Sequence, residues 1–187
     1  MNTKFLIIPI ILLIISFGIG TGYALQLSVP DTDPSVRWVN AIGCSDLQTH
    51  ECVDELVRDD NDYIQSVGIG KTNVDKQFYT LSDVTDPLSS INHVLTYTVR
   101  EANVGTNPVK LNVILYQGNS IIASWANTNL STTFTGVSQS LTALQADSIT
   151  DYTNLKLELD ASCDGTCGNS PSAREKIQVS WIQFTVD

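Results

Sequence analysis

Apolar and polar residues alternate with a period of two along much of the chain, most regularly in the segment 154–160. There, three leucines alternate without exception with Lys156, Glu158 and Asp160. Successive side chains of a β-strand point to opposite faces of its sheet, so this rhythm predicts a strand with one buried and one solvated face. We therefore expect the leucines in a core and the three charged side chains in water.

Shorter segments with the same rhythm, or rich in β-branched residues, are separated by turn residues. They predict further strands at 63–69, 77–81, 94–100, 111–116, 121–125, 132–141 and 176–186. The apolar parity shifts within the last of these strands, which predicts a β-bulge or a strand covered on both faces.

Other local signals are consistent with this pattern. Gly118 and Asn119 form a two-residue hairpin signal. The segment 142–150 is expected to contain one or two helical turns. Many short strands with almost no amphipathic helix predict an all-β fold, for which we favour an antiparallel β-sandwich that is jelly-roll-like.

The first 24 residues have the features of a secretory signal peptide. Lys4 precedes an apolar run, and the small residues Gly22 and Ala24 stand at the expected cleavage point. The alternative is an uncleaved anchor, because about 20 mostly apolar residues suffice to span a membrane. A lead-in with a disulfide loop (25–62) and a β-sandwich domain (63–187) follow. Both are expected to be secreted or at the cell surface.

Four cysteines lie in the exported part of the chain, and an even number there suggests two disulfides. Three connectivities are possible. Local pairing of Cys44 with Cys52 and of Cys163 with Cys167 requires the least long-range coincidence. A metal site is the weaker alternative, because the spacings do not repeat the C-x2-C unit of zinc sites.

The chain is acidic, with 10 basic and 20 acidic residues and a net charge of −10. An acidic surface repels nucleic-acid phosphates and anionic lipids. We therefore expect no nucleic-acid partner, and membrane contact only through the N-terminal segment if it is uncleaved.

One acidic run, Asp59, Asp60 and Asp62, is a candidate metal site. Clustered loop carboxylates supply the oxygen ligands that calcium prefers. Their spacing does not match an EF-hand, and the alternative is a solvated acidic loop. Calcium is the one cofactor that the sequence suggests.

Catalytic machinery is not recognisable. A Ser-His-acid triad needs a histidine, and only His50 and His93 exist, with His93 expected at the surface. No Gly-x-Ser-x-Gly motif is present. Twenty acidic residues make some carboxylate pair inevitable, so acidity alone does not indicate a glycosidase. We therefore expect no enzyme.

Ligand-binding and modification sites have weak signals. Sugar binding needs exposed aromatic rings, and Trp125 is the best exposed candidate among the tryptophans, although we favour core or edge packing for it. Trp38 is expected at the sandwich edge and Trp181 in the core. Asn129 begins the sequon Asn-Leu-Ser, which predicts a surface loop and a possible glycosylation site.

A resemblance to a known type of protein covers most of the chain, from residue 61 to residue 186. The motifs that carry it are Asp62-Tyr63-Ile64, Leu81-Ser82-Asp83 with Asp86-Pro87, residues 146–152 before Leu155-Lys156-Leu157, and residues 178–182. The chain resembles secreted jelly-roll or concanavalin-like β-sandwich proteins of environmental microbes and viruses. These are similar to carbohydrate-binding modules and mostly lack an assigned activity. The resemblance implies the fold and export, and it implies no active site.

Two functions follow as hypotheses. The first is an extracellular binding or adhesion module for a surface glycan or an extracellular protein. The second is a structural subunit of a filament or coat that self-associates by strand addition, with the alternating segment 25–29 as the donor strand. A secreted hydrolase is the weakest interpretation, because the sequence shows no credible nucleophile and base.

Overall fold

The computed structural model describes residues 24–35, 37–42, 48–70, 74–102, 107–165, 167 and 175–187. The predicted signal segment, apart from Ala24, lies outside these residues, as does Cys44. In the described part of the chain, no helix has the length and hydropathy needed to cross a membrane.

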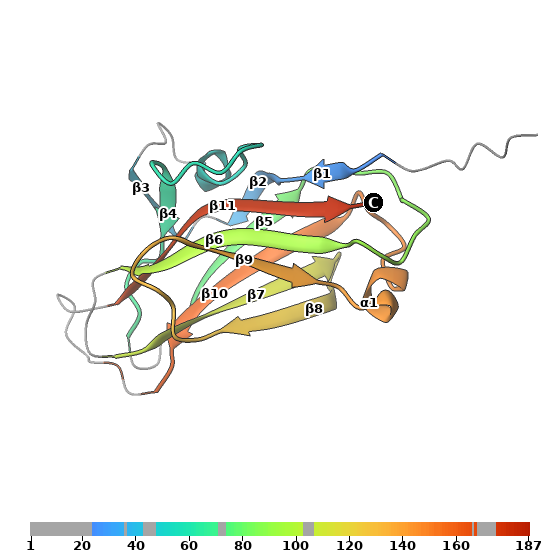
Figure 1. Cartoon of the computed structure of the whole chain (residues 1–187). Coiled ribbons are helices and arrows are strands. Elements are labelled where there is room, and N and C mark those ends of the chain that lie inside the picture. The colour runs from blue at the N-terminus through green and yellow to red at the C-terminus, as the bar shows by residue number, and fades with distance from the viewer. Residues whose placement is uncertain are drawn as a thin grey trace, which may run out of the picture.

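The described strands form two antiparallel sheets that pack face to face (Figure 1). Sheet one has the order β3 (Val39–Ile42), β4 (Tyr63–Gln65), β11 (Lys176–Val186), β6 (Val94–Ala102) and β9 (Thr135–Ser140), and β1 (Gln26–Ser28) also pairs with β11. Sheet two has the order β2 (Pro30–Ser35), β5 (Asp75–Leu81), β10 (Leu155–Cys163), β7 (Val109–Gln117) and β8 (Ser120–Asn127). A 3-10 helix, η1 (Thr49–Cys52), and a short α-helix, α1 (Ala143–Asp147), connect strands. From β4 to β11 most consecutive strands lie in opposite sheets, so the predicted jelly-roll-like β-sandwich is confirmed.

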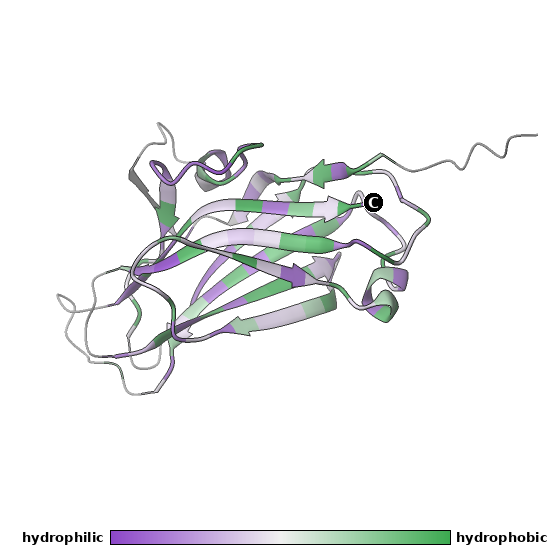
Figure 2. Ribbon diagram, viewed as in Figure 1, coloured by the Kyte–Doolittle hydropathy of each residue, from purple (hydrophilic) through white to green (hydrophobic). Residues whose placement is uncertain are grey.

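One apolar interior joins the two sheets. The three leucines of β10 are buried, as their alternation predicts, and β6 and β11 of the other sheet contribute Tyr97 and Phe184. Figure 2 shows hydrophobic and hydrophilic bands that alternate along the strands. Removal of apolar surface from water is the dominant favourable term in folding, so this shared interior determines which face of each strand is buried.

The parity shift predicted in the last strand is a β-bulge. β11 slips by one residue against β6 between Val179 and Trp181, which makes Ser180 the extra residue. Trp181 is partly exposed, and its indole N–H donates to the backbone oxygen of Glu55 at 2.7 Å. The expectation that Trp181 lies in the core is therefore wrong, because the bulge changes the parity of the strand. Trp38 packs across the sandwich edge, as expected: it is buried just before the edge strand β3, and its indole N–H donates to the backbone oxygen of Asp75 in β5 of the other sheet at 3.3 Å.

The predicted lead-in (25–62) is part of the sandwich. β1 and β3 belong to sheet one, and β2 belongs to sheet two. β1 pairs with β11 of its own chain, with Gln26 opposite Val186 and Ser28 opposite Phe184. The segment 25–29, which we considered as a donor strand, thus contributes β1 to a sheet of its own chain. Strand exchange between copies stays a prediction.

The predicted disulfide Cys163–Cys167 is confirmed, with an S–S distance of 2.11 Å. It closes a short loop at the end of β10, next to Pro108 at the start of β7. Cys52 is buried and is also a disulfide cysteine. Because Cys44 lies outside the described residues, the pairing of Cys44 with Cys52 stays a prediction.

Replacement of Leu157 by Ala should lower the free energy of unfolding by about 2–5 kcal/mol, because it leaves a cavity between the sheets. The matched control is Leu144→Ala, since Leu144 is 83% exposed on α1. We expect the control to change stability by less than about 0.5 kcal/mol. Urea denaturation of both variants measures the difference, and equal losses would contradict the described core.

Candidate ligand-binding site

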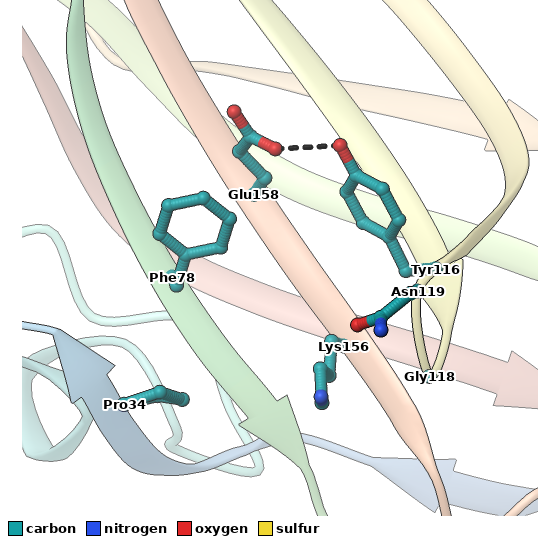
Figure 3. Close-up of a pocket in the computed structure, with 7 residues that line it drawn as sticks. All are labelled: Pro34, Phe78, Tyr116, Gly118, Asn119, Lys156 and Glu158. Carbon is teal, nitrogen blue, oxygen red and sulfur yellow. Dashed lines mark hydrogen bonds between the residues drawn. The ribbon is translucent and has the colours of Figure 1, made fainter.

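The outer face of sheet two, opposite the core, carries a pocket with a volume of about 320 Å³ (Figure 3). Strands β5, β7 and β10 and the turn between β7 and β8 form it, next to the end of β2. The residues from those three strands and the turn are Phe78, Tyr116, Gly118, Asn119, Lys156 and Glu158. The volume lies at the lower end of the range for small-molecule sites, about 300–1,000 Å³.

The antiparallel register brings these residues together. Glu158 lies opposite Phe78 across the β10–β5 pair, and Lys156 lies opposite Tyr116 across the β10–β7 pair. Directly opposite residues of paired strands point to the same face of the sheet, so all four side chains share the outer face. Figure 3 shows the two rings on either side of β10, with Glu158 between them and Lys156 further along the strand, near Asn119.

Glu158 points outward, as predicted, but it is not solvated: it is only 2% exposed. The ammonium group of Lys76 donates to its Oε1 at 2.5 Å, and the hydroxyl group of Tyr116 donates to its Oε2 at 2.7 Å. A buried carboxylate is stable only when it is paired and hydrogen-bonded. The expectation of a solvated side chain is wrong here, because long side chains on the two neighbouring strands cover the carboxylate.

These contacts change the titration of the two donors. Burial, followed by the hydrogen bond to Glu158 and the charge of Glu158, raises the pKa of Tyr116 to about 12. The hydrogen bond to Glu158 raises the pKa of Lys76 above its ordinary value. At neutral pH Lys76 is therefore an ammonium group and Tyr116 is a neutral phenol, and Lys76 forms an ion pair with Glu158.

The predicted hairpin turn forms one wall of the pocket. Gly118 has a φ of +58°, a conformation that glycine adopts without strain. The turn places Asn119 beside Lys156 in Figure 3. In the same view the Lys156 ammonium group lies away from the carboxylate of Glu158. The pocket thus combines two aromatic rings with an amide and two charged side chains.

A second hollow, of about 480 Å³, lies at one end of the sandwich. Its lining includes Asp83, Asp86 and Asp151 together with Tyr152. It lacks the facing pair of aromatic rings that the pocket on sheet two has, so we consider it the weaker ligand site.

The three aspartates of the predicted calcium site have separate partners. Asp59 accepts two hydrogen bonds from Asn61, and Asp60 pairs with Arg58 and accepts a hydrogen bond from Ser180 at 2.7 Å. Asp62 lies beside a different carboxyl group. Among the described residues, no three metal-ligating side chains converge on one point. Calcium binding stays a prediction.

The neighbour of Asp62 is Glu55. Glu55 Oε2 and Asp62 Oδ1 are both buried, and in the described part of the chain no N–H group and no hydroxyl group donates a hydrogen bond to either atom. Two ionised carboxylates can only accept hydrogen bonds, so a proton on one of them is needed to join the pair. Burial raises the pKa of Glu55 to about 8, and the hydrogen bond and charge of Asp62 add to this rise.

The other predicted residues lie away from the pocket on sheet two. Trp125 is half-buried against the core and lies opposite the buried Val113, so it occupies the inner face of the edge strand β8. Asn129 is exposed in the loop between β8 and β9, where a sequon is expected, and its glycosylation stays a prediction. His93 is buried, not at the surface, and its Nε2 lies 2.6 Å from the hydroxyl oxygen of Tyr152.

Sequence reasoning missed Phe78 and Tyr116 as residues of the pocket on sheet two. Both residues lie in strands that the alternation predicted, at positions that point away from the core. The alternation could therefore have indicated that their rings lie on an outer face. The sequence does not show the strand order β5-β10-β7, and this order places the two rings beside Glu158 and Lys156.

No protein-family model and no curated protein matches the sequence. Several solved structures are similar in shape. One is the xylan-binding module CBM15 (TM-score 0.44, 12% identity, 85% of this chain and 95% of that chain). A second is TmCBM61 in complex with β-1,4-galactotriose (TM-score 0.40, 4% identity, 88% of this chain and 89% of that chain). A third is a cyclase from Fischerella sp. TAU (TM-score 0.35, 11% identity, 84% of this chain and 87% of that chain). These likenesses are too distant to assign a function, so we base the function on the pocket itself.

The Glu55–Asp62 pair should make stability depend on pH. The pKa of Glu55 in the folded protein, about 8, lies above its ordinary value of 4.5. The folded state therefore binds a proton that the unfolded state releases, and stability falls as the pH rises from about 5 to about 9. Thermal melts of the wild type should show this fall, and Glu55→Gln, which stays neutral, should flatten it. An unchanged slope in the variant would contradict the shared proton.

Proposed function

We propose that this protein is a non-enzymatic binding or adhesion module of the cell surface, and that it binds a glycan in the pocket on sheet two. The observation that carries the proposal is the placement of Phe78 and Tyr116 on either side of polar side chains. A sugar ring offers apolar C–H groups on its faces and hydroxyl groups at its edge. Aromatic rings beside a few oriented polar groups provide the matching surface.

The polar groups of the pocket suit binding better than bond cleavage. Glycoside hydrolysis uses two carboxyl groups that flank the scissile bond. Glu158 is the one carboxylate among the described residues of the pocket, and both of its oxygens already accept hydrogen bonds. Such a carboxylate positions Tyr116 and Lys76, and it is not free to act as an acid or a nucleophile.

Two features support a site of action outside the cytoplasm. The first 24 residues have the composition of a secretory signal. The disulfide Cys163–Cys167 is of a kind that persists mainly in oxidising compartments.

A glycan array followed by calorimetry with the best ligand tests the proposal. Phe78→Ala and Tyr116→Ala should each weaken binding by about tenfold or more, because each removes a stacking surface. Tyr116→Phe keeps the ring and loses the hydrogen bond to Glu158, so it should weaken binding less.

Two control variants complete the experiment. Ile121→Ala removes an exposed side chain from the edge strand β8 outside the pocket, and it should bind as the wild type does. Trp125→Phe should also leave affinity unchanged, because Trp125 lies on the inner face. The proposal fails if the array shows no glycan ligand, or if binding survives the loss of both Phe78 and Tyr116.

A further inference from the structure

The pocket on sheet two contains a positive charge that the protein itself does not compensate. Lys156 lines the pocket, and no ion pair or side-chain hydrogen bond joins it to another residue in the described part of the chain. Its ammonium group lies on the side of the pocket away from Glu158 (Figure 3).

The negative charge of Glu158 is already paired with a positive charge of the protein, that of Lys76. Its two oxygens accept hydrogen bonds from Lys76 and Tyr116, and the residue is almost completely buried. Asp160 follows on the same face but is about 13 Å from Lys156 along the strand and does not line the pocket. Among the described residues of the pocket, the ligand-facing part therefore has a net charge of +1, which comes from Lys156.

This local charge is opposite in sign to that of the whole protein. The chain has a net charge of −10, so an anion is repelled over most of the surface. An unpaired ammonium group in a pocket that is also lined by two aromatic rings reverses this preference at one place. Loss of water on binding strengthens such a contact, because nearby charges interact more strongly in a less polar medium.

We propose that the pocket selects an acidic sugar, a glycan unit with a carboxylate or sulfate group that pairs with Lys156 while its ring stacks on Phe78 and Tyr116. This inference rests on the proposed glycan site and specifies its ligand class. It also predicts that affinity falls with ionic strength, although the protein and its ligand are both acidic.

Affinity electrophoresis and calorimetry with two matched polymer pairs test this inference. Polygalacturonate is compared with its methyl ester, which has the same backbone without the charge, and a sulfated galactan is compared with its desulfated form. The first pair tests a carboxylate and the second a sulfate. We expect at least one acidic polymer to bind about tenfold or more tightly than its neutral partner, and to bind more weakly at about 0.5 M salt than at 0.05 M.

Three lysine variants test whether the preference for an acidic polymer comes from the charge of Lys156. Lys156→Gln should lose the preference for the acidic polymer, and Lys156→Arg should retain it. Lys110→Gln is the matched control, because Lys110 lies at an outward position of β7 but does not line the pocket. Circular dichroism and thermal melts of each variant establish that the fold is intact.

The outcomes separate this inference from the proposed function. Equal binding of both members of each pair, or full binding by Lys156→Gln, overturns the acidic ligand. The glycan site survives that result if Phe78→Ala and Tyr116→Ala still lose binding to a neutral glycan. Absence of binding to every polymer of the array and of the two pairs overturns both.

Discussion

Burial of one face of β10 is the constraint on which the site depends. β10 lies in the middle of sheet two, between β5 and β7, and its leucines are fixed in the interior that joins the sheets. The pleat of a strand leaves no other direction for the residues between them. Lys156 and Glu158 must therefore point outward, and the register with β5 and β7 sets Phe78 and Tyr116 beside them. The same packing that stabilises the fold thus aligns the pocket.

The two outer faces of the sandwich differ because one of them is covered. The loop between η1 and β4 lies against sheet one, where Glu55 accepts the indole hydrogen bond of Trp181. The guanidinium group of Arg100 stacks on Phe134, 4.1 Å from the ring centre, and also lies over Tyr63. These contacts occupy the aromatic surface of sheet one. Among the described residues, no guanidinium group covers the rings of sheet two, where we propose that the glycan binds.

Local rhythm was enough to predict the strands from β4 to β11, the hairpin at Gly118 and the bulge in β11, because each of these is encoded by neighbouring residues. It missed β2, which lies in the segment interpreted as a lead-in. Alternation also gave the direction of Glu158. It did not give its burial, which depends on Lys76 and Tyr116 from strands far away in the sequence. Trp125 packs against the core from the edge strand β8, which is the core or edge packing that we favoured for it over an exposed binding role. Sequence alone also did not show that Asp60 of the acidic run has Arg58 and Ser180 as partners, and calcium binding there stays a prediction.

The extra residue at Ser180 has a consequence for the recognition of relatives. A homologue whose final strand lacks the insertion would need a one-residue gap inside that strand to match this chain. Without the gap, its inward residues would be aligned with Trp181 and Gln183, and its outward residues with Ile182 and Phe184. Gaps are normally placed in loops, where insertions are tolerated best. An alignment of distant relatives should therefore be scored separately on the two sides of this position.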